Sequence, residues 1–291
     1  MKKTFFKLYR FSNTWTGTII IVLLVIFFFA QAFVIPSGSM KNTLHEGDHL
    51  LVKKYVYGIP TPHLPWLEIP LLPDFDGDGH LFAGERPKRG DVVVFRYPHD
   101  PKIHYVKRCV AVGGDGVMLR GDTLYIRPHE GESYVRKNFL PEQIVRFGDE
   151  LWVANPYRVK HPGVRYDQRA RQSVMMPLET YDFGPVTVDK EHFFMVGDNR
   201  DHSNDSRFWG SVPYKHIVGK PWFMYFSWES RPYENVVRHN AFVSDYEAVE
   251  RVCGELDPIS AECKAAWEKN RYKVRWDRIG RSVEALEKQL R

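Results

Sequence analysis

The sequence predicts a mainly β protein with an antiparallel β-sheet core, an inserted smaller domain, one N-terminal transmembrane helix and a short helical C-terminal segment. Three observations lead to this prediction. Residues 11–40 contain no charged side chain. Short runs of β-branched and aromatic residues, separated by turns with Gly and Pro, recur over residues 49–126 and 193–228, as expected of strands. After residue 229 the sequence changes to polar, helix-compatible stretches.

The apolar run is long enough to span a membrane. A helix needs about 20 apolar residues to cross the bilayer core, and residues 15–35 meet that length. Four basic side chains precede the run: Lys2, Lys3, Lys7 and Arg10. Because basic flanks stay on the cytoplasmic side, we expect residues 1–14 inside and everything after Ile35 outside.

A cleavable signal peptide is the alternative for this stretch. The basic start, the apolar run and Ala30-Gln31-Ala32 also fit such a peptide, and the mature chain would then begin at Phe33. Apolar character continues through Ile35, which favours an uncleaved anchor.

The composition is that of a globular chain without a nucleic-acid partner. Charged residues make up 26% and hydrophobic residues 43%, so long disordered regions are not expected. The net charge of +5 is mild, the basic residues are scattered, and no nucleic-acid-binding motif accompanies them. Scattered basic residues favour a solvated surface or attraction to anionic lipid.

Three cysteines are too few for a fold built on disulfides. Cys253 and Cys263 lie close in sequence, in a segment expected outside the cytoplasm, where disulfides persist. They are therefore candidates for one disulfide, which would leave Cys109 unpaired.

The strand-like runs divide the chain into units. Buried-strand signals at residues 91–96 and 105–112, with a hairpin at 117–126, define a core at residues 36–126 and 186–228. Residues 127–185 are polar and weakly patterned and are interpreted as an inserted smaller domain. Residues 229–272 are expected to form a helical insertion, and residues 273–291 a final strand and tail.

One polar loop has the spacing of a calcium site. Asp74, Asp76 and Asp78 match the opening of an EF-hand loop, and Glu85 falls on its twelfth position. Prolines stand on both sides and neither flank has helical periodicity. A polar turn between strands is the favoured interpretation, and calcium binding stays open.

Two residues could form the chemical centre of a hydrolase. Ser39 follows Gly38 in a tight turn just after the apolar run, and Lys107 lies in an apolar strand. An apolar environment lowers the pKa of a lysine, which would allow Lys107 to act as a base near neutral pH. Taken alone, Lys107 would more simply be a surface charge. Neither a Gly-x-Ser-x-Gly elbow nor a His-Glu-x-x-His zinc motif occurs.

Four ordered segments make the assignment specific. They are Pro36-Ser37-Gly38-Ser39-Met40, Arg89-Gly90-Asp91-Val92-Val93-Val94-Phe95, Tyr105-Val106-Lys107-Arg108, and Gly197-Asp198-Asn199-Arg200-Asp201-His202-Ser203-Asn204-Asp205-Ser206-Arg207. In this order, and directly after a membrane span, they closely resemble the motif set of bacterial type I signal peptidases, a family of Ser/Lys-dyad peptidases. The segments cover a modest part of the chain.

The resemblance implies roles for individual residues. Ser39 would be the nucleophile and Lys107 its general base. The Ser37 hydroxyl and the Ser39 backbone N–H would form the oxyanion hole. Ser203 would orient the lysine amine, and Asp205 would form a salt bridge with Arg207.

Further residues would complete the site. Asp198, Asn199 and Asp201 would shape the loop that carries Ser203. The pocket for small substrate side chains would be lined by Phe33, Ile35, Leu44, Tyr105 and Val106.

The resemblance also implies the biology. The expected function is a membrane-anchored serine endopeptidase that removes signal peptides from secretory preproteins after Ala-x-Ala-type sites. It would act without metal or other cofactor, as a monomer on the lipid bilayer. Slow cleavage of its own chain after Ala32 is a further hypothesis. It would cross the bacterial inner membrane once, with its N-terminus cytoplasmic and its catalytic domain periplasmic.

The chain departs from the family pattern in three places. The family usually has Pro-Thr shortly after the methionine, where this chain has Lys41-Asn42-Thr43. It often has a second span, and its segment corresponding to residues 229–272 is expected to be shorter.

Two other functions are alternatives for this sequence. A related Ser/Lys peptidase with another task, such as a self-cleaving repressor, would need a DNA-binding domain and no anchor. A tethered binding protein on a degenerate peptidase scaffold would have lost Ser39 or Lys107, and both are present.

Overall fold

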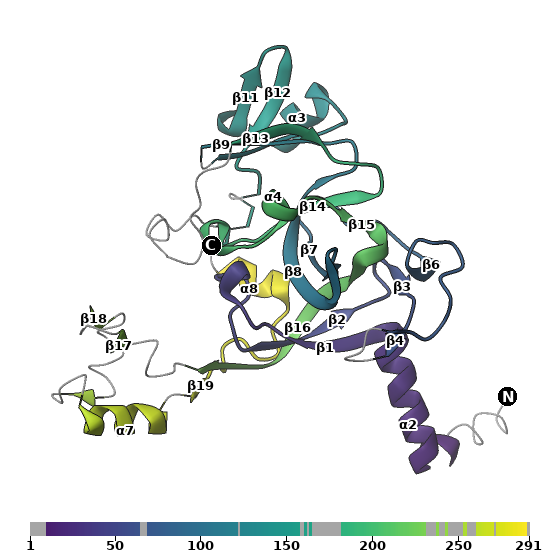
Figure 1. Cartoon of the computed structure of the whole chain (residues 1–291), viewed down its shortest axis with the longest axis vertical. Helices are drawn as coiled ribbons and strands as arrows, with labels where there is room; N and C mark the ends of the chain where they lie inside the picture. Colours follow the sequence, from purple (N-terminus) through teal and green to yellow (C-terminus); the bar gives the residue numbers. More distant parts are fainter. Residues whose placement is uncertain are drawn as a thin grey trace.

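The computed structural model is mainly β, with antiparallel sheets and few helices, which confirms the predicted mainly β, antiparallel class (Figure 1). The structure describes residues 10–64, 69–121, 123–157, 160–161, 163–164, 182–230, 237–238, 242–243, 253–254, 260–270 and 272–289.

The larger sheet carries the residues of the predicted core. Its strands are, in spatial order, β1 (Ala30–Val34), β2 (Asp48–Lys53), β16 (Ile217–Ser230), β7 (Val92–Tyr97), β8 (Asp100–Val112), β14 (His192–Val196) and β15 (Val212–Pro213), with β19 (Tyr272–Val274) paired to β16. Every pairing is antiparallel. The long strands β8 and β16 bring distant parts of the chain together in this sheet.

Burial explains why these segments form strands. In β2 buried and partly exposed residues alternate, as in a strand with one face on the core. In β7 five successive residues are buried, so both faces are covered. Met40 and Leu44 pack in one core cluster with Leu50 and Val52 of β2. The turn after β1 is thus anchored in the core.

A smaller sheet lies at one end of the molecule, at the top of Figure 1. Its strands are, in spatial order, β11 (Ile144–Phe147), β12 (Glu150–Ala154), β10 (Thr123–Arg127), β9 (Gly116–Arg120) and β13 (Phe183–Thr187).

The boundary of this unit differs from the prediction. The hairpin formed by β9 and β10 was assigned to the core, but it pairs with β13 and β12 in the smaller sheet. The inserted unit therefore begins near Gly116 rather than at Arg127. A local hairpin pattern does not identify the sheet it will join, because the other pairing partners come from sequence 20 or more residues away.

The predicted helix over residues 15–35 is too long. The helix α2 (Trp15–Leu24) continues into the π-helical turn η1 (Val25–Phe29), and the backbone then becomes extended at Ala30. Residues 30–34 form β1, in which Phe33 pairs with Leu50 of β2. A short apolar run fits a helix or a buried strand equally well, and pairing with β2 decides here. No helix in the part of the chain that the structure describes is both long and apolar enough to cross a bilayer.

The remaining elements are short. The helices and helical turns are η2 (Gly38–Met40), α3 (Glu132–Asn138), η3 (Pro141–Gln143), η5 (Arg200–His202), α4 (Ser206–Trp209), η6 (Tyr214–His216), α7 (Ala261–Asn270) and α8 (Val283–Gln289). The small pairings are β3 (Gly58–Pro60) with β6 (His80–Ala83), β4 (His63–Leu64) with β5 (Ile69–Pro70), and β17 (Val237–Arg238) with β18 (Phe242–Val243).

The C-terminal segments agree with the expectations as far as they are described. Cys253 and Cys263 form a disulfide, and Cys109 is free and buried. The helix α7 lies in the expected helical insertion, most of which is outside the described residues. The final strand is β19, and the tail forms the helix α8.

Candidate active site

Ser39 lies in a tight turn between β1 and β2. It is the middle residue of η2, and its side chain is nearly buried. The backbone N–H groups of Thr43 and Leu44 both donate to the carbonyl oxygen of Met40, so the chain turns sharply after Ser39. The turn holds the Ser39 hydroxyl beside Lys107.

Lys107 on β8 contacts Ser39, although β16 and β7 separate β8 from β2 in the order of the sheet. Its Nζ lies 2.6 Å from Ser39 Oγ and also donates to the carbonyl oxygen of Val106 at 3.0 Å. The side chain is 3% exposed. Burial lowers the pKa of Lys107 to about 8, and the carboxylates of Asp205 and Asp198 limit this decrease. Near neutral pH a useful fraction of the amine is therefore uncharged.

Asn199 holds the nucleophile turn through two hydrogen bonds. Its backbone N–H donates to the carbonyl oxygen of Ser39 at 3.0 Å, and its side-chain amide donates to the carbonyl oxygen of Gly38, also at 3.0 Å. The hydroxyls of Ser37 and Ser39 are 3.5 Å apart. A group bound at Ser39 would therefore lie within reach of the Ser37 hydroxyl.

Asp198 is the centre of a buried polar network. Arg108 donates to its two carboxylate oxygens at 2.8 and 2.6 Å, and the Thr43 hydroxyl donates at 2.6 Å. Burial disfavours the charge on Asp198, but the Arg108 ion pair outweighs this effect and keeps the pKa of Asp198 below its usual value. The sequence had assigned no role to Arg108 or Thr43. Arg108 stood inside a quoted motif, which was the only available signal.

The loop from β14 to α4 contains the expected ion pair. Arg207 Nε donates to Asp205 at 2.8 Å, and the Asp205 carboxylate also accepts from the backbone N–H of Gly197 at 2.9 Å. Burial opposes the charge on Asp205, and Arg207 reverses the effect, so the pKa of this carboxyl is lowered.

One expectation for this loop is not met, and a second concerns a side chain that the structure does not describe. The Ser203 hydroxyl is buried and makes no hydrogen bond of normal geometry with any described residue, so the expected contact with Lys107 is not formed. The hydroxyl is close enough to Asp205 to help lower the pKa of that carboxyl. The side chain of Asp201 lies outside what the structure describes.

A cavity of about 420 Å³ opens beside Ser39 and Lys107. Four of the expected pocket residues line it: Phe33, Ile35, Tyr105 and Val106. Leu44 does not, because it is fully buried in the core beneath the nucleophile turn. The lining residues that the sequence analysis missed include Ile103, His104, His202 and Asn204, which come from β8 and the loop before α4. Ile103 and His104 directly precede the motif that begins at Tyr105, and His202 and Asn204 lie inside the motif from Gly197 to Arg207.

The calcium-like loop does not form a cluster of ligands. Asp74 accepts a hydrogen bond from the backbone N–H of Gly79, and Asp78 accepts one from that of His80. Glu85 pairs with Lys88. Within the described residues, the carboxylates of this loop do not converge on one point. The loop is a polar turn.

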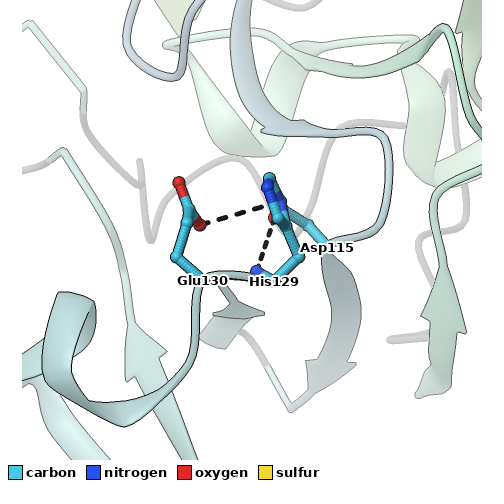
Figure 2. Close-up of side chains that lie close together, drawn as sticks. All are labelled: Asp115, His129 and Glu130. Atoms are coloured by element: carbon cyan, nitrogen blue, oxygen red, sulfur yellow. Dashed lines mark hydrogen bonds and ion pairs between the residues drawn. The ribbon is translucent and has the colours of Figure 1, made fainter.

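One cluster has metal-ligand chemistry, but an arginine already supplies its positive charge. Asp115, His129 and Glu130 converge before β9 and after β10 (Figure 2). Arg89 donates to Asp115 at 2.6 Å and to Glu130 at 2.7 Å, and one of its nitrogens lies 3.1 Å from His129 Nδ1. The guanidinium takes the place that a cation would fill.

A second cavity of about 610 Å³ borders this cluster. Several of its charged residues are also paired, Arg86 with Glu191 at 2.6 Å and Lys88 with Glu85 at 2.8 Å. These pairs neutralise the charges of Arg86 and Lys88.

Comparison with known proteins identifies similar sequences over nearly the whole chain. Residues 8–227 match the family model described as signal peptidase, peptidase S26. The signal peptidase I of Helicobacter pylori strain J99 is 45% identical over 97% of this chain and 95% of the relative. The signal peptidase I of Pseudomonas fluorescens is 37% identical over 76% of this chain and 73% of the relative.

Proposed function

The chain belongs to the signal peptidase family, peptidase S26, and is a serine peptidase that cleaves signal peptides; we propose that it is a membrane-anchored Ser/Lys-dyad enzyme that cuts exported preproteins after Ala-x-Ala-type sites. The observation that best supports a Ser39/Lys107 dyad is the buried 2.6 Å contact between Lys107 Nζ and Ser39 Oγ.

In the first step Lys107 acts as the general base. Its uncharged amine accepts the proton of the Ser39 hydroxyl as Oγ attacks the carbonyl carbon of the substrate. The pKa of about 8 supports this role, because an appreciable part of the amine is neutral at physiological pH. The protonated lysine then gives its proton to the leaving amine.

The negative charge that develops on the substrate oxygen needs donors nearby. The Ser37 hydroxyl lies 3.5 Å from Ser39 Oγ, and the Ser39 backbone N–H belongs to the same turn. These two groups are the proposed oxyanion hole. The neutral lysine next activates a water molecule that hydrolyses the ester on Ser39.

The cavity supports specificity for small side chains. Phe33, Ile35 and Val106 give this cavity of about 420 Å³ apolar walls. Alanine side chains fit such walls without leaving polar groups unpaired, and charged side chains do not. The proposed substrates are therefore signal peptides that end in Ala-x-Ala. All of the proposed catalytic groups belong to one chain, which supports a monomer.

The N-terminal helix supports attachment to a membrane. Apolar side chains at residues 19–25 are each 41–56% exposed, so α2 and the start of η1 present apolar groups on all sides. A helix that is apolar all round belongs inside a protein or inside a bilayer. The disulfide between Cys253 and Cys263 supports an oxidising compartment. We place the N-terminus in the cytoplasm and the catalytic domain on the periplasmic side of the bacterial inner membrane.

The test is cleavage of a preprotein with an Ala-x-Ala site by the detergent-purified protein. Ser39→Ala and Lys107→Ala should each lower kcat/KM at least about a thousandfold. Lys102→Ala is the matched control, because Lys102 is exposed on the same strand, and it should leave cleavage unchanged. Cleavage that survives Ser39→Ala or Lys107→Ala would contradict the dyad. If the parent fails in both lipid and detergent, the tethered binding protein becomes the better hypothesis.

A further inference from the structure

The C-terminal helix α8 is packed against the turn that carries Ser39. Val283 and Leu286 are each 3% exposed and belong to the same core cluster as Met40 and Leu44. These two residues of the nucleophile turn and the two residues of α8 are more than 230 positions apart in the chain. The fold thus brings the tail of the protein beneath its reactive serine.

The segment before α8 is fixed to the same region. Gly280 N–H donates to the carbonyl oxygen of Met224 at 2.8 Å, and Met224 N–H donates to that of Arg281 at 2.9 Å. Arg278 donates to Asp48 at 2.6 Å and to the carbonyl oxygen of Thr43 at 3.1 Å. These contacts fix the place where α8 begins.

Glu287 on α8 reaches the polar network around Asp198. Its Oε1 accepts a hydrogen bond from Arg108 Nη2, and its Oε2 lies 3.1 Å from His161 Nδ1. The residue is 9% exposed. Both oxygens therefore have partners in a place largely closed to water.

Arg108 uses one nitrogen to hold two carboxylates. Nη2 donates to Asp198 at 2.6 Å and also to Glu287, which accounts for both of its hydrogens. Nε donates to the other oxygen of Asp198, and Nη1 to the carbonyl oxygen of Gly90. Arg108 is fully buried, so loss of Glu287 would leave an N–H without a partner and free the guanidinium to tilt.

The network continues from Asp198 to the nucleophile. The backbone N–H of Asp198 points to the sulfur of Met40 at 3.4 Å, and the next residue, Asn199, donates to the carbonyl oxygens of Ser39 and Gly38. A tilt of Arg108 would move Asp198, and with it the hydrogen bonds by which Asn199 holds Ser39 and Gly38.

We infer that Glu287 is a positioning residue for Ser39, acting through Arg108 and Asp198. The inference rests on the proposed function, because it assigns a role within the same site. Glu287 lines neither the cavity nor the contact between Lys107 and Ser39, so it would act on the reaction indirectly, through the Arg108–Asp198 network that holds the nucleophile turn.

The experiment measures kcat and KM of full-length variants on the Ala-x-Ala preprotein, at a temperature where circular dichroism shows each variant folded. Glu287→Ala should lower kcat about tenfold, as expected of a small misplacement of a reacting group, and leave KM within about twofold. Glu287→Gln keeps an oxygen that can accept from Arg108 and should recover most of the loss. Glu284→Ala, exposed on the same helix, is the matched control and should behave as the parent.

A second comparison covers the case in which Glu287→Ala does not fold. Glu287→Asp keeps the charge but withdraws the carboxylate by one methylene, so its kcat should fall below that of Glu287→Gln. The reverse order would overturn a role based on geometry.

A double-mutant cycle separates positioning from general stability. The Thr43 hydroxyl holds the same Asp198 carboxylate, so Thr43→Val and Glu287→Ala should affect kcat less than additively. Additive effects on kcat would contradict the claim that both residues act on Ser39 through Asp198.

The outcomes for the two claims are distinct. An inactive parent would reject the proposed function. An active parent with unchanged kcat in folded Glu287→Ala would reject only the positioning role.

Discussion

The backbone N–H of Asn199 donates a hydrogen bond to the carbonyl oxygen of Ser39 at 3.0 Å, and its side-chain amide holds the preceding residue, Gly38. Loss of the side chain removes one of these two restraints. We predict that Asn199→Ala lowers kcat about tenfold with little change in KM. Steady-state kinetics on the Ala-x-Ala preprotein provide the check.

The control for this prediction is Asn138→Ala, because the Asn138 amide caps a carbonyl oxygen of α3, far from Ser39 in sequence and sheet. It should leave kcat unchanged. Equal kcat for Asn199→Ala and the parent would show that the backbone bond alone positions the serine.

The pKa of Lys107, about 8, predicts how the rate depends on pH. Below pH 8 most of the amine is protonated and cannot accept the proton of Ser39. The value of kcat/KM should therefore rise about tenfold per pH unit on the acidic side and level off above pH 8. A profile that is flat between pH 6 and 9 would contradict lysine as the base.

The same burial should make Lys107 destabilising at neutral pH. Its pKa falls from an ordinary 10.5 to about 8 on folding, so below pH 8 the folded state carries a charge that burial disfavours. Between pH 8 and 10.5 the unfolded state binds more protons, and stability rises with pH. At about 1.4 kcal/mol per pH unit, Lys107→Met should raise the free energy of unfolding at pH 7 by up to about 3 kcal/mol.

The gain in the free energy of unfolding from Lys107→Met should shrink as pH approaches 10, because the lysine of the parent then loses its charge in both the folded and the unfolded state. Urea unfolding of the parent and the variant at pH 7 and pH 10 measures this gain. A gain that is the same at both pH values would assign it to packing rather than to the charge.

Gly197 has no room for a side chain. A Cβ at this position would lie 2.2 Å from Ser203 Oγ and 2.6 Å from the carbonyl oxygen of Ser39. Since the second atom is backbone, Gly197→Ala must displace the nucleophile turn, and it should cost about 3 kcal/mol or more and abolish cleavage.

The control is Gly148→Ala. A Cβ there meets nothing within 4 Å, although its φ of +59° disfavours alanine. It should cost about 1 kcal/mol and leave activity intact. Thermal unfolding and preprotein cleavage test both variants.

Much of the candidate site could be predicted because its residues lie in short local motifs. Ser39, Lys107, Asn199 and Asp205 were named from sequence, and the sheet brings their segments together. Leu44 was assigned to the pocket because it lies near Ser39 in sequence. The turn directs it into the core instead, and periodicity over so few residues does not reveal that direction.

What could not be predicted depends on distant pairing. The end of the N-terminal helix at Phe29 is set by β2, which pairs with residues 30–34. Glu287 belongs to a polar tail with no motif, and only packing of α8 against Met40 and Leu44 brings it to Arg108. Neither relationship leaves a local pattern in the chain.

Strand β1 also has a consequence for substrates. Its five residues, at about 3.3 Å each, span roughly 16 Å between the end of the apolar helix and residues 35–37, which lead into the nucleophile turn. If that helix lies in the bilayer as proposed, β1 sets how far along the chain Ser39 lies from the lipid. A preprotein whose own apolar helix ends a similar extended length before the cleavage site would match this spacing. The enzyme would thus select substrates by the distance between their apolar helix and the cleavage site, as well as by the side chains at that site.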